Sequence, residues 1–300
     1  MSVDELIRRH PRERLFVQPL EWTSRHLELL QCVFELRADV VLNLRRGAAD
    51  DDNRSDLDSR PVDPRPFDYW THEAECLATS ETKNAVIRRL LTERDGPFKC
   101  IRPFGYFHFG ADHSFRLHGL VFAPRSQRQV PPQDDAPVFA FMQRGMIKYQ
   151  RGTVFPMPRP RRREHRRNLP VAAQQQLHLK LLEPEDPCRD PYILAVLLGL
   201  AQAQAQKIAS DDSTDRRGHE YRVCAILVDE ANSECMNFYS AKISASFLAK
   251  FDYPEDLQPP ASLSSSLAIR YTKFPYKPYS SMRRRLIDAI TLNSTMNVRQ

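Results

Sequence analysis

Three histidines and one aspartate with metal-ligand chemistry lie within the stretch 108–118, namely His108, Asp112, His113 and His118. Imidazole and carboxylate groups are donors that divalent transition metals take from proteins. A β-hairpin over this stretch would bring them near one another, which makes them a candidate metal site. The alternative is an aromatic hairpin with a polar turn, because His108 and His118 share a face only in some registers.

Two fragments resemble the metal-binding pattern of PD-(D/E)XK nucleases. Glu81-Thr82-Lys83 matches the E-x-K tripeptide, but Ser80 before it predicts a helix cap where that superfamily has a strand. Asp229 and Lys242 fall on strand-like segments, with Ser240 where the second carboxylate belongs. Because at least two acidic ligands must hold the ion that activates water, neither fragment is complete. A metal-dependent hydrolase, in the form of a degenerate nuclease, is kept as the alternative function, and no catalytic residue is nominated.

An arginine run gives the strongest local signal. Six of the nine residues from 159 to 167 are arginines: Arg159, Arg161, Arg162, Arg163, Arg166 and Arg167. The positive electrostatic field of these guanidinium groups attracts phosphates, an acidic protein or a nuclear import receptor. The alternative is a solvated charged loop.

A second basic patch near the C-terminus interleaves cations with aromatic rings. It comprises Lys273, Tyr276, Lys277, Tyr279, Arg283, Arg284 and Arg285. Single-strand binders combine these two residue types. A half-buried strand whose charged side faces water gives the same alternation, so both interpretations stay open.

Composition limits the classes to which the chain can belong. The 300 residues carry a formal net charge of +6 and include 9 Gly and 23 Pro, and neither a G-x-G-x-x-G nor a P-loop motif occurs. The longest apolar run, 192–201, is too short to span a bilayer, and no secretory signal follows Met1. Six cysteines without a C-x-x-C pair indicate a reducing compartment. We therefore expect a nuclear or cytoplasmic protein that is not secreted and has no membrane partner.

Hydrophobic periodicity predicts the helices that would position these residues. They cover 24–46, 71–94, 171–182, 191–207, 245–251 and 281–293. The helix after Asp190-Pro191 has the clearest signal, because Asp caps a helix, Pro suits its first turn, and Ile193–Leu200 is apolar on every face.

Period-2 runs predict three hairpins and one further strand. The hairpins pair 98–109 with 114–122, 138–143 with 146–155, and 221–228 with 236–243, and the strand covers 267–274. The fold class is therefore α+β, with an antiparallel or mixed sheet of about seven strands packed by four to five helices and with two flexible inserts.

The predicted organisation along the chain has five parts. These are a helical segment 1–48, an acidic flexible linker 49–66, a helix with two hairpins 67–156, an Arg/Pro-rich loop 157–170, and a buried helix, hairpin, strand and terminal helix 171–300. We expect 67–156 and 171–300 to form one compact domain.

Three stretches resemble a family of uncharacterised fungal proteins. They are 190–193 (DPYI), 243–252 (ISASFLAKFD) and 274–279 (FPYKPY), and the resemblance covers mainly residues 188–290. No activity is established for that family, so the resemblance implies a single intracellular domain and carries over no site residue.

The leading function is therefore a non-enzymatic, nuclear binding protein that uses its basic patches against nucleic acid or an acidic protein. No cofactor is expected in that case, whereas a divalent metal would accompany the hydrolase alternative.

Overall fold

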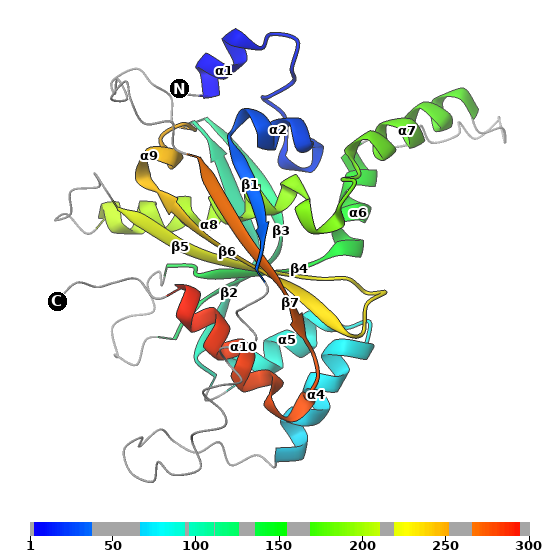
Figure 1. Ribbon diagram of the computed structural model, residues 1–300, viewed down its shortest axis with the longest axis vertical. Coiled ribbons are helices and arrows are strands. Elements are labelled where there is room, and N and C mark those ends of the chain that lie inside the picture. Colours follow the sequence, from blue (N-terminus) through cyan, green and yellow to red (C-terminus); the bar gives the residue numbers. More distant parts are fainter. Residues whose placement is uncertain are drawn as a thin grey trace.

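The computed structural model describes residues 3–37, 67–93, 96–110, 112–125, 136–154, 169–210, 219–251 and 266–294. Within them, seven strands form one mixed sheet in the order β1-β7-β6-β5-β4-β3-β2 (Figure 1). The predicted α+β class with a mixed sheet is confirmed. The insert predicted at 49–66, and residues 157–168 of the second insert, lie outside the described residues.

The strands pair partly as hairpins and partly across the chain. Their bounds are β1 Cys32–Leu36, β2 Phe98–Phe109, β3 His113–Pro124, β4 Phe139–Gln143, β5 Glu220–Val228, β6 Cys235–Ser244 and β7 Leu267–Pro275. The predicted hairpins β2–β3 and β5–β6 are antiparallel, as are β3–β4 and β6–β7. The pairs β1–β7 and β4–β5 are parallel, which makes the sheet mixed.

Helices cover both faces of the sheet (Figure 1). One face packs against α1 Val3–Arg9, the 3-10 turn η1 Pro19–Glu21, α2 Ser24–Leu29, α6 Arg144–Val154, α8 Pro191–Ser210 and α9 Ala245–Leu248. The other face packs against α4 Phe67–Thr79, α5 Lys83–Thr92 and α10 Tyr279–Ser294. The core is therefore double, with the sheet between its halves.

Strand β5 shows how one sequence serves both halves. Val223, Ala225 and Leu227 join the α8 side, whereas Cys224, Ile226 and Val228 join the α10 side. Successive side chains of a strand point to opposite faces, so a strand that is covered on both faces is apolar throughout.

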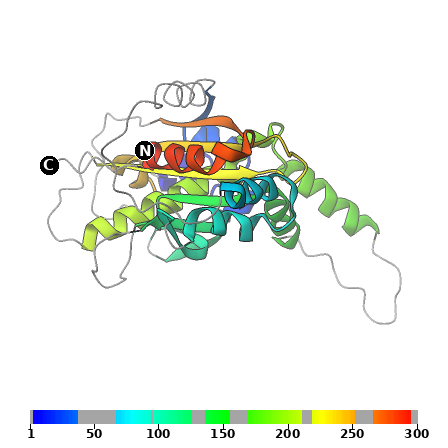
Figure 2. The ribbon, with the colours of Figure 1, turned by 90° about the horizontal axis from the view of Figure 1, so that it is seen from below.

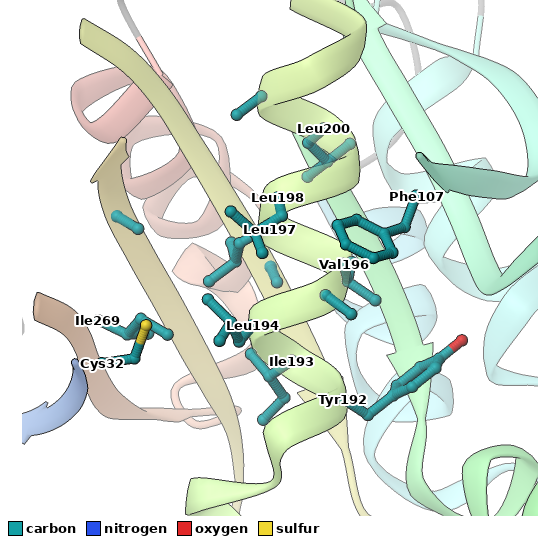
Figure 3. Packing of buried hydrophobic residues seen from close by; sticks show 14 of the residues in the cluster. Cys32, Phe107, Tyr192, Ile193, Leu194, Val196, Leu197, Leu198, Leu200 and Ile269 are labelled. Carbon is teal, nitrogen blue, oxygen red and sulfur yellow. The ribbon is translucent and has the colours of Figure 1, made fainter. Parts of the chain in front are cut away.

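Helix α8 is central to the first half, as its all-apolar sequence predicts. Figure 3 shows Leu194 and Leu197 on the side toward Cys32 and Ile269, with Val196 on the side toward Phe107. The N-terminal segment covers the helix from outside, because α2 and η1 also contact it. Burial on every side explains why Ile193–Leu200 has no polar face.

The helix predicted over 24–46 is wrong beyond Leu29. Gln31 adopts a left-handed conformation, with φ of 59°, and ends the helix in the manner of a C-terminal cap. Cys32–Leu36 then pairs in parallel with Leu267–Tyr271 of β7. The apolar residues of this stretch suit either structure, and the long-range pairing decides for a strand.

The helix predicted over 71–94 is two helices. The Lys83 side chain lies at the start of α5, and its Nζ donates to the backbone oxygens of Leu77 (2.6 Å) and Ala78 (3.0 Å), near the end of α4. A buried lysine thus satisfies carbonyls that a helix end leaves unpaired.

The strand predicted over 146–155 is a helix, α6. Its first turn is anchored by the loop after β5: the Gly145 amide donates to both Glu230 carboxylate oxygens (3.0 and 3.2 Å), and Arg144 pairs with Asp229 at 2.7 Å. Carboxylates near a helix N-terminus are favourable, so distant acidic residues stabilise a segment of ambiguous pattern.

The predicted helix over 171–182 is confirmed as α7, Leu169–Leu182. It projects from the body of the fold in both ribbon views (Figures 1 and 2). Leu177 and Leu181 are accordingly exposed, at 58% and 67%. The 3-10 turn η3, Pro187–Arg189, then leads into α8.

Candidate anion-binding site

A pocket of about 360 Å³ lies between the β2–β3 hairpin and α8, next to the start of β4. We call its buried apolar part the floor, formed by Leu117, Val121, Ala140, Val196 and Leu200. We call its polar part the rim, formed by Arg102, Tyr106, His108, His118, Gln206 and Lys207. This volume is within the range of small-molecule sites, about 300–1,000 Å³.

Three contacts hold α8 against the hairpin and so fix the pocket walls. The Gln202 side chain accepts from the His108 amide (2.9 Å) and donates to the His108 carbonyl (2.8 Å). Strand β2 is the last strand of the sheet, so these two bonds connect an edge strand to α8. The Tyr192 hydroxyl accepts from the His118 amide at 2.6 Å. Gly199 lets the helix approach the Tyr106 carbonyl where a Cβ atom would collide. These contacts preorganise the pocket.

A ladder of rings runs along one face of β2 beside the pocket. Phe104, Tyr106 and His108 alternate with inward residues, as period-2 geometry requires. The Phe104 and Tyr106 ring centroids are 5.5 Å apart, and those of Tyr106 and His108 are 6.4 Å apart. From β3, the Arg116 guanidinium lies 3.9 Å from the Phe104 ring centroid, a cation–π contact.

The charge at the pocket is of one sign. Arg102 and Lys207 supply cations, His108 and His118 supply imidazoles, and no Asp or Glu lines the described part of the pocket. Burial lowers the pKa of both histidines, and nearby Arg116 lowers that of His118 further. Both rings are therefore neutral at pH 7 and gain charge on acidification. Such a site attracts anions.

The structure places the four predicted metal ligands in different surroundings. In the hairpin register His118 lies opposite Phe104 and His108 opposite Ser114, so the two histidines share a face about 13 Å apart along the strands. His113 packs against the Phe16 ring, with centroids 4.8 Å apart, and Asp112 is exposed at the turn. Across the described ranges, no three His, Cys, Asp or Glu side chains form a group able to hold a metal ion.

The two predicted basic patches differ in what the structure shows. The arginine run lies outside the described residues. In the C-terminal patch, Tyr276 is buried. Arg283 donates to the Leu90 carbonyl (2.8 Å) and lies 3.9 Å from the Trp70 ring centroid. Arg285 donates to the carbonyl oxygens of Pro275, Tyr276 and Pro278. These two arginines therefore hold α10 in place.

The remaining cations of that patch face solvent. Lys273, Lys277 and Arg284 are exposed. Lys277 Nζ lies 5.9 Å from the ring centroid of half-buried Tyr279, and Arg284 pairs with Asp288 at 4.0 Å. They form a weaker candidate surface than the hairpin, because the one ring shown beside them in the described residues, that of Tyr279, is half-buried and is not part of a ladder of rings.

The two nuclease-like fragments stay apart from each other and from the pocket. Glu81 is exposed, while Lys83 is buried at the junction of α4 and α5. Asp229 follows β5 and pairs with Arg144. Lys242 lies opposite Arg222, about 23 Å from Asp229 along the sheet. In the described residues these groups do not converge on one position.

Comparisons with known proteins do not add a family. No protein-family model matches the chain, and no curated protein matches it either. Among the helices that the structure describes, none has both the length and the apolar character that a bilayer span needs. The site is therefore interpreted from its geometry.

Most residues of this site belong to no motif that the sequence displays. Arg102, Phe104, Tyr106 and His108 recur at every second position of a predicted strand, and that alternation was the available signal. Lys207 belongs to the pocket only because α8 crosses the hairpin, which no local pattern indicates.

Proposed function

We propose that this protein is a non-enzymatic binding protein for single-stranded nucleic acid and that the strand lies along the β2–β3 hairpin. The observation that carries the proposal is the ring ladder of β2 flanked by Arg102, Arg116 and Lys207 with no acidic side chain in the described pocket lining. Single-strand binders combine a cationic path for the backbone with rings on which bases stack.

Tyr106 is the ring best placed for stacking. It is 37% exposed, and it lies between Phe104 and His108 on the same face of the strand. A base stacked on an aromatic side chain contributes about 1–3 kcal/mol, with little preference for the base. Phosphates on either side would meet Arg102 and Lys207.

An acidic protein is the other polyanion that the basic patches predict. Carboxylates need the cations but gain little from exposed rings, so the aromatic ladder favours nucleic acid. The metal-dependent hydrolase is the less supported alternative, because the described residues contain no group of three His, Cys, Asp or Glu side chains that could hold a metal ion.

Binding to a fluorescent single-stranded 12-mer, followed by anisotropy at low salt, tests the proposal. Tyr106→Ala should weaken binding by about 5- to 150-fold, the change in Kd that corresponds to a loss of about 1–3 kcal/mol of stacking energy. Tyr149→Ala is the matched control, since Tyr149 is a 67% exposed tyrosine on α6 away from the pocket. Failure of the intact protein to bind, or equal losses in both variants, would refute the proposal.

Nuclear location is part of the same proposal, with the arginine run 159–167 as the import signal. A fluorescent fusion should enter the nucleus, and replacement of the six arginines by Ala should leave it in the cytoplasm. Equal distribution of both fusions would contradict this part.

A further inference from the structure

Stacking along the hairpin leaves the pocket floor unexplained. The five floor residues are all apolar and buried, and Ala203 of α8 continues this surface toward the mouth. Their side chains offer no hydrogen-bond donor or acceptor. A nucleobase seated there would leave its polar edge unpaired, which costs about 1–3 kcal/mol per group.

The rim has the opposite character. Arg102 and Lys207 approach it from β2 and from the end of α8, His108 and His118 line it from the two hairpin strands, and Gln206 adds an amide. A ligand that fits both parts has an apolar body for the floor and one negative group for the rim.

We propose that the pocket binds a small amphiphilic anion, with an alkyl or aryl body on the floor and a carboxylate or phosphate head at the rim. This site goes beyond the proposed nucleic-acid function, because a strand on the outer face does not require the floor. Burying one CH₂ group contributes about 0.8 kcal/mol, so each added methylene of the body should strengthen binding.

The pocket walls belong to the core of the fold, which favours this assignment. Val121 and Ala140 lie on adjacent strands of the sheet, while Val196 and Leu200 project from α8 one turn apart. Gln202 and Tyr192 fix the helix to the hairpin. A preformed apolar cavity with few convergent polar groups is the usual form of a small-molecule site.

Isothermal titration of the intact protein with octanoate and octyl phosphate tests the proposal, with octanol and inorganic phosphate as single-part probes. Both anionic amphiphiles should bind at least about tenfold more tightly than either single-part probe. If octanol bound as tightly as octanoate, the charged rim would not contribute to binding. If inorganic phosphate bound as tightly as octyl phosphate, the apolar floor would not contribute. Either result overturns the proposal.

Filling the pocket gives an independent arm. Ala203→Leu places a larger side chain in the lining and should reduce octanoate affinity at least about tenfold, while Ala173→Leu on the exposed face of α7 should not. Unchanged octanoate binding in Ala203→Leu would overturn the proposal. If that variant does not fold, Lys207→Gln serves instead, because loss of a rim cation should weaken octanoate binding and leave octanol unaffected.

The two proposals fail separately. Ala203→Leu should bind the 12-mer as the original chain does, because Ala203 lies on α8 and the stacking rings lie on β2. Octanoate binding without oligonucleotide binding would refute the nucleic-acid function alone, and the reverse would refute the amphiphile site alone.

Discussion

Replacing Arg151 with an apolar residue should strongly destabilise the fold, because its ion pair with Asp190 is buried. The guanidinium donates twice to the carboxylate, at 2.7 and 2.8 Å, and once to the Leu20 carbonyl at 3.1 Å. The two side chains are only 6% and 9% exposed. The same carboxylate accepts from the Tyr192 amide at 2.9 Å and so caps α8.

Arg151→Met keeps much of the side-chain volume and leaves the Asp190 carboxylate with the Tyr192 amide but without its cation. Removing one partner of a buried pair costs about 3–5 kcal/mol. With a urea dependence of about 3 kcal/mol per M, the unfolding midpoint should fall by about 1 to 2 M. Circular dichroism at 222 nm during urea titration measures this shift.

Arg189→Met is the matched control, since Arg189 is 58% exposed and pairs with Asp186 at 3.2 Å on the surface. Its loss should cost less than about 1 kcal/mol. Arg151→Met with Asp190→Asn should lose less than the sum of the two single changes, because no unpaired charge is left. If Arg151→Met loses no more stability than Arg189→Met, the argument from burial is wrong.

Three further predictions concern the core, the pocket and the arginine run. Leu197→Asp buries a charge in the α8 core and should give insoluble protein, whereas a soluble variant with unchanged melting temperature would place α8 outside the core. Burial lowers the pKa of His108 and His118 from 6.5, so anion binding should strengthen as the pH falls through the pKa values of the folded protein. The free energy of unfolding without ligand should decline below pH 6.5, because the unfolded chain then binds more protons. The double variant His108→Gln with His118→Gln should flatten the dependence of anion affinity on pH. If the arginine run 159–167 makes three to five phosphate contacts with duplex DNA, a plot of log K against log salt concentration should have a slope of about −3 to −4.5. Replacement of these arginines by Ala should make that slope less steep.

The sequence by itself determined the elements whose local pattern has one solution. Asp190-Pro191 followed by the apolar run 192–201 specifies a buried, capped helix, and α8 is that helix. The strand-like runs on either side of Gly110, and those on either side of the turn 229–234, specify hairpins, because short turns join antiparallel neighbours. These elements account for the α+β class.

Tertiary structure decided the segments whose pattern fits two conformations. Cys32–Leu36 became a strand because β7 offered a parallel edge, and Arg144–Val154 became a helix because Asp229 and Glu230 meet its first turn. Both decisions depend on residues far away in the chain, which periodicity does not register.

The candidate site was decided in the same way. The alternation of Phe104, Tyr106 and His108 is local, so the sequence determined that these three side chains share a face. The floor and the rim arise only where α8 crosses the hairpin, held by Gln202. The relation between a helix and a strand nearly a hundred residues apart is set by the packing of the whole core, and that packing exists only in the folded chain.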